Sequence, residues 1–221
     1  MKAMVERLNA LEEAGLRRRL ATPAGIDLTS NDVLGLSRDA QIAQAIRQAL
    51  DQGLPTGSTG SRLLSGHGDH WAALEARFAA WQGRQASLFF ATGYSANVGL
   101  LSSVIEAGDT VLSDALNHAS LIDGLRLSKA DVGIVEHLNL DAYETALKAA
   151  GPGAWVVVES VFSMDGDLAP LEELTELARH YRARLLVDEA HATGIFGPQG
   201  AGRCHLLAPD ARPFASIHPC G

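Results

Sequence analysis

Four groups of polar residues that could do chemistry each follow a short apolar segment of the chain. They are Gly93 and Tyr94 after SLFFA, His118 after TVLSD, Ser163 after WVVVES, and Asp188 and His191 after RLLV. If the apolar segments are parallel strands, these residues lie outside their carboxyl ends, where open α/β sheets bind ligands. Taken singly, each residue is better explained as a helix cap. Four groups on one edge indicate a ligand site.

The letters from Asp188 to His191 also spell DEAH, the motor box of nucleic-acid helicases. Such a motor needs a glycine-rich phosphate loop that ends in Gly-Lys-Ser or Gly-Lys-Thr. The chain has three lysines, Lys2, Lys129 and Lys148, and none of them follows a glycine. The sequence also lacks a dinucleotide-binding fingerprint and a Gly-x-Ser-x-Gly hydrolase elbow. These three classes of protein are therefore disfavoured.

The residues at the strand ends suit a phosphorylated heteroaromatic cofactor. The turn TGYSAN after SLFFA would begin a helix, and the free N–H groups of a helix N-terminus bind phosphate. A carboxylate at the end of a buried strand, such as Asp188, would keep a pyridine nitrogen protonated. Pyridoxal phosphate is the cofactor that fits this set best.

Regular elements that would hold this edge can be predicted from apolar spacing. Apolar residues at helical spacing predict an N-terminal helix, which the basic triplet Arg17 to Arg19 follows. We expect residues 1–36 to form a helix and arm, and residues 37–221 to form one large domain. Further helices are expected over 38–53, 69–83 and 170–183, the second with a buried stripe of Trp71, Leu74, Phe78 and Trp81 and with Asp69 as its cap. Five apolar runs, ASLFFA, DTVLSD, GIVEHL, AWVVVES and ARLLVDE, predict a mainly parallel sheet flanked by helices on both faces.

Composition limits the classes of partner. The chain has 221 residues, 47% of them hydrophobic, and a net charge of −8, which argues against a nucleic-acid groove. We expect no membrane segment, and charges interrupt the N-terminus where a signal peptide needs an apolar core. No metal is expected. The spacing of Cys204 and Cys220 is not that of a metal site, and His67 and His70 do not make one by themselves. These features favour a cytoplasmic protein.

Six longer stretches resemble the α-oxoamine synthases, a pyridoxal-phosphate family of fold type I. Between Ser30 and Arg203 these stretches occur in the family's order: SNDVLGLS, GSTGSRLLSGHGDHWAALE, ATGYSAN, LNHASLIDG, VVESVFSMDGDLAPL and LLVDEAHATGIFGPQGAGR. The family joins an amino acid to an acyl thioester with loss of carbon dioxide. The sequence is most similar to members that use L-alanine and a pimeloyl thioester of CoA or acyl carrier protein. Members that use glycine or serine stay open, and a homodimer is implied.

The resemblance implies a role for each of several residues. Asp188 would pair with the pyridinium nitrogen, and His191 would bond the phenolic oxygen, with Ser163 on the same edge. His118 would stack on the ring. The remaining assignments are Gly93 and Tyr94 near the phosphate, Glu159 close to the cofactor, and Arg17 on the amino-acid carboxylate, with Arg18 and Arg19 as adjacent alternatives.

The resemblance also implies one more strand, which RPFASI matches, and after it a lysine that carries the cofactor as a Schiff base, expected immediately after Gly221. Pro219 stands where the family usually has Thr, and His67 is another departure from the family pattern. We expect the chain to be the N-terminal part of a longer polypeptide. The alternative is a non-catalytic scaffold that keeps the fold without the lysine.

Overall fold

The computed structural model describes residues 2–22 and 24–220, and it separates into two compact units, Met1–Val33 and Leu34–Gly221. In the first unit, helix α1 (Lys2–Glu13) confirms the predicted N-terminal helix. Glu12 accepts ion pairs from Arg17 at 3.1 Å and from Arg19 at 2.9 Å, which holds the basic triplet back against the helix. The roles expected for residues 1–36 and 37–221 stay predictions.

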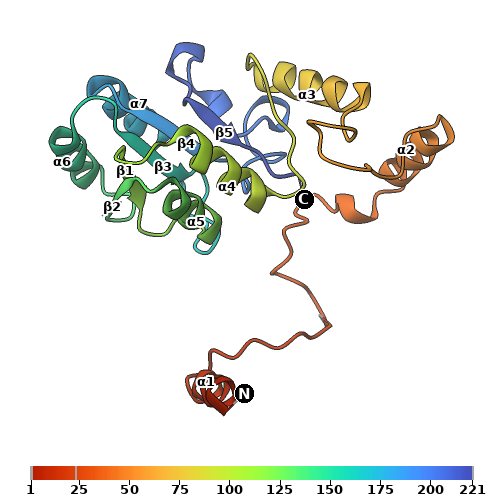
Figure 1. The fold of residues 1–221 in the computed structure, drawn as a ribbon, viewed down its shortest axis with the longest axis horizontal. Coiled ribbons are helices and arrows are strands. Elements are labelled where there is room, and N and C mark those ends of the chain that lie inside the picture. The colour runs from red at the N-terminus through yellow and green to blue at the C-terminus, as the bar shows by residue number, and fades with distance from the viewer. Residues whose placement is uncertain (1, 23, 221) are drawn as a thin grey trace. The chain divides into compact units, whose positions relative to one another are not determined.

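A five-stranded parallel sheet organises the second unit (Figure 1). All four strand pairs are parallel, in the order β2-β1-β3-β4-β5. The strands are β1 (Thr110–Asp114), β2 (Asp131–Val135), β3 (Trp155–Glu159), β4 (Arg184–Asp188) and β5 (Ala215–Ile217). The parallel sheet predicted from the apolar runs is confirmed.

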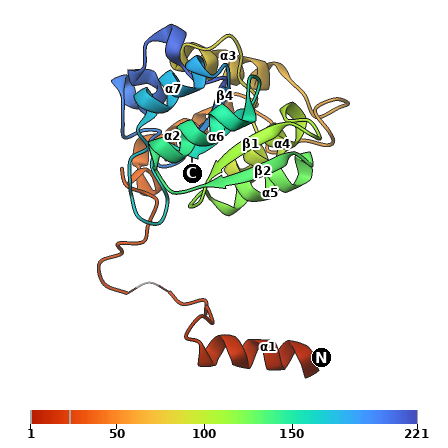
Figure 2. The same cartoon turned by 90° about the vertical axis from the view of Figure 1, so that its left-hand side faces the viewer.

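Helices cover both faces of the sheet, as Figure 2 shows from the side. Alternate strand residues point to opposite faces, so each face has its own core. Val111, Val157 and Leu186 pack with α4 and α5 on one face, and Leu112, Val156 and Val187 pack with α6 and α7 on the other. These helices are α4 (Gly93–Val104), α5 (Ala119–Ser128), α6 (Leu140–Ala150) and α7 (Leu171–His180). The predicted three-layer α/β fold is therefore confirmed.

Two further helices of the second unit, α2 (Ala40–Asp51) and α3 (Asp69–Gln82), come before α4 in the chain. Asp39 caps α2 by accepting two backbone N–H bonds, whereas α3 begins after Gly68, so the expectation that Asp69 is its cap is wrong. Short 3-10 turns complete the chain at Leu36–Arg38, Pro198–Gly200, Arg203–Leu206 and Pro209–Ala211.

The buried stripe predicted for α3 is wrong in part. Leu74 is 41% exposed, and the three aromatic residues are only half-buried. Instead of entering either core, Trp71 stacks on Phe89, and Phe78 packs edge-on against Trp81 and His218. The apolar spacing was helical, but it did not indicate what the helix would pack against.

The strand predicted at ASLFFA is also wrong. The described structure gives residues 86–91 no ladder partner, and Leu88 and Phe89 are 66% and 46% exposed. A strand exists only when its backbone groups pair with a neighbour. Here Glu75 holds the segment instead, because its carboxylate accepts the Phe89 N–H at 2.8 Å and its carbonyl accepts the Ser87 hydroxyl at 2.8 Å.

Candidate active site

Asp188 ends β4 with its side chain inside the protein. It is 4% exposed, and burial raises the pKa of its carboxyl above the usual value. Its Oδ2 accepts the Asn97 amide N–H at 2.7 Å, and its Oδ1 accepts the Ala190 N–H at 2.8 Å. Within residues 2–22 and 24–220, neither a lysine nor an arginine forms an ion pair with this carboxylate. A buried carboxylate of this kind fits a cationic ligand group.

Glu159 ends the neighbouring strand β3 and is a second buried carboxylate. Its Oε1 accepts the His118 N–H at 2.6 Å, and its Oε2 accepts the Ser163 N–H at 3.2 Å. Burial, followed by the charge of Asp188, raises the pKa of Glu159 to about 7. The carboxylate therefore ties together the chain segments that follow β1 and β3.

His118 caps α5, the helix that follows β1. Its Nδ1 accepts the Ser120 N–H at 3.2 Å, and its ring lies edge-on to Tyr94 with centroids 6.5 Å apart. The ring itself stays exposed. An imidazole fixed at one nitrogen and open on its face is able to pack against a flat ligand.

The N-terminus of α4 provides a polar seat on the same edge. Thr92 and Ser95 form a reciprocal capping box, and the N–H groups of the first turn have no acceptor inside a helix. A Cβ at Gly93 would lie 2.5 Å from Pro219, so only glycine allows this approach. The hydroxyl of Tyr94 donates to Asp123, and its expected contact with a phosphate stays a prediction.

The remaining predicted residues have different surroundings. Ser163 offers its backbone to Glu159 in the loop after β3, and His191 lies half-buried in the turn after β4. Arg17 belongs to the unit of residues 1–33, where it pairs with Glu12. The lysine expected after Gly221 lies outside the described residues.

The sequence analysis gave no role to Asn97 and Ser120, two buried polar residues that connect the predicted ones. The Asn97 amide donates to Ser120 Oγ at 2.9 Å as well as to Asp188. A signal was present, because Asn97 lies one helical turn after Gly93 among small and apolar residues, and a buried amide needs partners.

The part of the chain that the structure describes holds no cluster of three or more His, Cys, Asp or Glu that could bind a metal. His67 Nδ1 instead lies 3.2 Å from the Arg62 guanidinium. Both cysteines are free, Cys204 buried and Cys220 exposed. In the same residues, no helix is long and apolar enough to cross a membrane.

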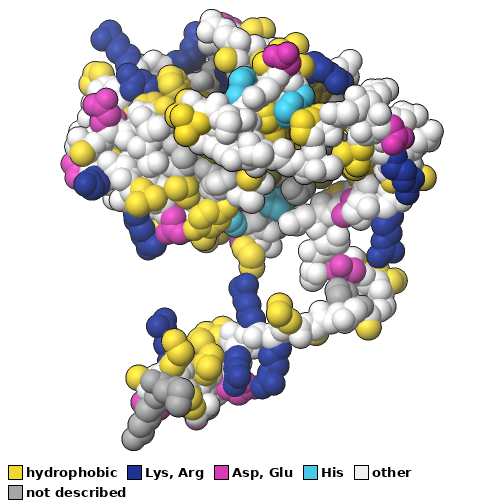
Figure 3. Space-filling model, turned by 45° about the vertical axis from the view of Figure 1, so that its right-hand side comes forward, with side chains coloured by type: hydrophobic (Ala, Val, Ile, Leu, Met, Phe, Trp, Pro, Cys, Tyr) yellow, Lys and Arg dark blue, Asp and Glu magenta, His cyan; other side chains and the backbone are white. Residues whose placement is uncertain are grey.

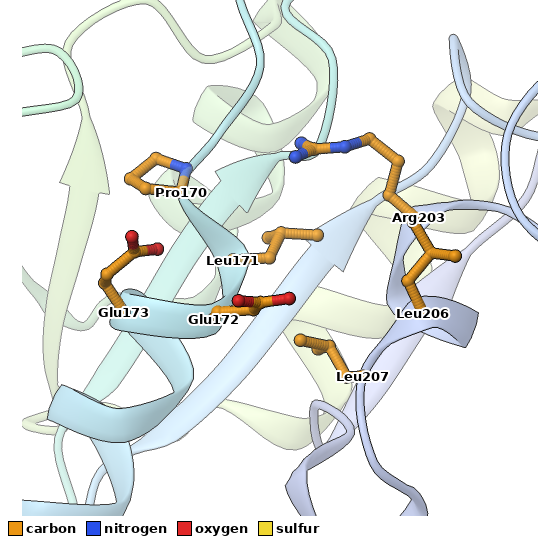
Figure 4. Close-up of a pocket in the computed structure, with 7 residues that line it drawn as sticks. All are labelled: Pro170, Leu171, Glu172, Glu173, Arg203, Leu206 and Leu207. Carbon is orange, nitrogen blue, oxygen red and sulfur yellow. The ribbon is translucent and has the colours of Figure 1, made fainter.

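A cavity of about 210 Å³ lies between α7 and the turn at Arg203–Leu206 (Figure 4). Its floor is apolar and its rim carries Glu172 and Glu173. The Arg203 guanidinium is already used, since it donates to the carbonyls of Ser160 and Ala169. None of the residues that line this cavity belongs to the candidate active site.

Comparison with known proteins bears on the family and the fold. The model of the aminotransferase class I and II family matches residues 23–216. A putative 8-amino-7-oxononanoate synthase of Geobacillus kaustophilus is 45% identical over 92% of this chain and 53% of its own length. The 8-amino-7-oxononanoate synthase of Paraburkholderia xenovorans is 43% identical over 100% of this chain and 60% of its own. The chain thus spans little more than half the length of these curated relatives.

Solved structures give the same fold. A serine palmitoyltransferase from S. paucimobilis, solved with PLP and myriocin bound, has a TM-score of 0.85 and 27% identity, covering 98% of this chain and 60% of its own. The 8-amino-7-oxononanoate synthase of Francisella tularensis has a TM-score of 0.68 and 30% identity over 81% of this chain and 49% of its own. The fold is that of PLP-dependent enzymes of fold type I, as the sequence resemblance implied.

Proposed function

Because this chain belongs to the aminotransferase class I and II family, we propose that the full-length protein is a pyridoxal-phosphate-dependent acyltransferase. The observation that carries the proposal is Asp188, a buried carboxylate at a strand end with no Lys or Arg counter-charge among the described residues. A protonated pyridine ring supplies that counter-charge. When bound, pyridoxal phosphate withdraws electrons from the α-carbon of an amino acid.

The residues of this chain would hold the cofactor from several sides. Asp188 would keep the ring nitrogen protonated, and His191 and Ser163 would bond the phenolic oxygen. His118 would lie on the ring face. The N–H groups of Gly93 and Tyr94 would receive the phosphate, because a helix N-terminus attracts anions.

Glu159 would act through the backbone of its neighbours. Its carboxylate accepts the backbone N–H groups of His118 and Ser163 and so fixes the backbone position of both residues. Glu159 would therefore orient the residues that face the ring without touching the reacting atoms. A lysine after Gly221 and Arg17 on the amino-acid carboxylate complete the proposal. A guanidinium matches a carboxylate with two parallel hydrogen bonds.

The proposed reaction condenses L-alanine with a pimeloyl thioester, with loss of carbon dioxide, to give 8-amino-7-oxononanoate in biotin biosynthesis. Support comes from relatives of that name at 42–47% identity. The acyl carrier would be CoA or acyl carrier protein. Both present the same thioester carbonyl, so a comparison of the two donors decides between them.

A cytoplasmic homodimer is part of the proposal. It is supported by the family resemblance and by large apolar side chains that remain on the surface, among them Leu63 and Leu64, which are 94% and 84% exposed. Figure 3 shows further hydrophobic side chains, in yellow, on the surface of the molecule. A contact with a second copy of the chain would remove such exposed leucines from water.

The test uses the full-length protein with pyridoxal phosphate. Release of free thiol is followed for L-alanine, glycine and serine, each paired with pimeloyl, acetyl, succinyl and palmitoyl thioesters. Fastest turnover with L-alanine and a pimeloyl thioester is expected. A visible absorbance band that borohydride abolishes should accompany it. Failure to bind the cofactor would instead favour a scaffold.

A further inference from the structure

A chain of hydrogen bonds joins Asp188 and His118, two of the residues that the proposed function places against the cofactor ring. Asn97, buried in α4, donates one amide hydrogen to Asp188 Oδ2 at 2.7 Å and the other to Ser120 Oγ at 2.9 Å. The opposite amide orientation would set Oδ1 against the carboxylate, which is repulsive. The orientation of Asn97 is therefore fixed by Asp188.

Ser120 carries the connection on to His118. Its Oγ lies 2.7 Å from His118 Nδ1, and its backbone N–H donates to the same nitrogen at 3.2 Å. A nitrogen that accepts a backbone N–H bears no proton, so the neutral ring carries its hydrogen on Nε2. Asn97 thus sits between the carboxylate and the imidazole.

The packing of α4 against α5 makes this bridge possible. A Cβ on Gly124 would lie 2.9 Å from the Leu101 side chain and 3.1 Å from the Asn97 carbonyl oxygen. Both helices therefore approach closely at Gly124, and the short Asn97 amide reaches Ser120. The bridge is a product of two helices and one strand, and each contributes one buried polar group.

The bond from Asn97 also acts on the charge of Asp188. Burial raises the pKa of this carboxyl, and the Asn97 N–H opposes that rise, with smaller opposing effects from the Ala190 N–H and from His118 and His191. Glu159, on the neighbouring strand, is the other acidic group facing it. Loss of the Asn97 donor would leave Asp188 neutral over a wider pH range.

We propose that Asn97 is a positioning residue that aligns the Asp188 carboxylate and, through Ser120, the His118 imidazole as one unit. Its effect on Asp188 stands on the geometry alone, while its effect on a cofactor ring rests on the proposed function. Neither residue of the bridge needs to touch the substrate.

The test compares Asn97→Leu and Ser120→Ala with the wild type in the full-length protein. Ser102→Ala is the matched control, because Ser102 lies in α4 and donates only to the Val98 carbonyl on an exposed face. Carbon-13 labelling of Asp side chains reports the Asp188 titration without cofactor, with Asp188→Asn to identify the signal. Asn97→Leu should move this titration to higher pH, whereas Ser120→Ala and Ser102→Ala should leave it in place.

Nitrogen-15 labelling of histidine reports the second half of the bridge. Asn97→Leu and Ser120→Ala should both change the His118 ring signals, and Ser102→Ala should not. Pyridoxal phosphate should bind about tenfold more weakly to Asn97→Leu, the effect of losing one hydrogen bond to a charged group. Asn97→Asp, which preserves the size of the side chain, should bind the cofactor progressively worse as pH rises and its own carboxyl ionises.

The outcomes separate the two proposals. An Asp188 titration that is the same in wild type and Asn97→Leu overturns the positioning role, whatever the activity. If Asn97→Leu fails to fold, the pH-dependent loss of binding in Asn97→Asp takes its place, and a pH-independent affinity there overturns the role. A shifted titration in a protein whose wild type binds no pyridoxal phosphate supports the Asn97–Asp188 coupling and refutes the proposed function.

Discussion

Glu159 and Asp188 are partners in the parallel ladder of β3 and β4, so two buried carboxylates lie at adjacent strand ends. Burial is the main cause that raises the pKa of both carboxyls, and the charge of Asp188 raises that of Glu159 further. The two differ in their donors. Asp188 accepts hydrogen bonds from a side-chain amide and one backbone N–H. Glu159 accepts hydrogen bonds from two backbone N–H groups, those of His118 and Ser163.

Asp188→Asn should lower turnover of the full-length protein by several factors of ten, each worth about 1.4 kcal/mol of barrier. The neutral amide no longer holds a ring nitrogen protonated. Thermal unfolding should remain close to wild type, because Asn has the same size. Asp165→Asn, on the exposed loop after β3, is the control. Near-normal turnover of Asp188→Asn would refute the role proposed for this carboxylate.

Glu159 should make the protein less stable as pH rises. Its folded pKa of about 7 lies above the ordinary value of 4.5, so the native state holds a proton that the unfolded state releases. The contribution of Glu159 to the free energy of unfolding is fully present below pH 4.5 and is lost as pH rises to 7, by up to roughly 3 kcal/mol. Glu159→Gln should abolish this loss in urea unfolding measured between pH 4.5 and 7.5.

His218 should act in the opposite direction. Burial, helped by the charge of Arg84, lowers its pKa to about 4, so the folded protein keeps it neutral between Thr193 and Ser216. Its contribution is present above pH 6.5 and is lost as pH falls to 4, again by roughly 3 kcal/mol. In wild type the two slopes partly cancel between pH 4.5 and 6.5.

The two variants therefore separate these effects. The free energy of unfolding of His218→Gln, measured in urea, should fall more steeply with rising pH than that of wild type, since the His218 slope no longer offsets the Glu159 slope. The free energy of unfolding of Glu159→Gln should rise with pH over the same range. Parallel pH profiles for both variants and wild type would contradict both assignments.

His137 bridges two acids beyond the candidate site, with Nδ1 2.7 Å from Asp114 and Nε2 3.3 Å from Asp167. Burial works to lower its pKa, but the bonds to Asp114 and Asp167 outweigh burial and raise it. Its stabilising effect should be present below pH 6.5 and be lost as pH rises through the raised pKa. His137→Gln should remove this pH dependence, while His180→Gln, on exposed α7 surface, should preserve it.

Gly93→Ala should weaken pyridoxal phosphate binding, because the new Cβ would displace Pro219 from the start of α4. Loss of about tenfold in affinity, or 1.4 kcal/mol, is expected in a fluorescence titration. Gly57→Ala is the matched control, since its Cβ meets no atom within 4 Å and its backbone has an ordinary φ. Equal affinities for the two variants would argue against a phosphate seat at α4.

The family resemblance and the three-layer fold followed from motifs that are local in sequence. Apolar runs such as WVVVES and RLLV predicted strands because a fully buried strand has no polar face, and the polar residues directly after them are fixed by chain connectivity to one edge of the sheet. The relatives and the parallel ladders confirm both inferences.

Long-range pairing decided the rest. The run SLFFA has the composition of a strand, yet no described segment pairs with it, and the aromatic stripe of α3 has no core to enter. Asn97 was missed because its importance comes from Asp188, 91 positions away in the chain. Sequence alone predicted the residues that follow β1, β3 and β4, since these depend on neighbours in the chain, whereas Gly93 and Tyr94 follow a segment that is not a strand. Which buried amide holds which carboxylate depends on how α4 packs on β4, and only the tertiary structure determines that.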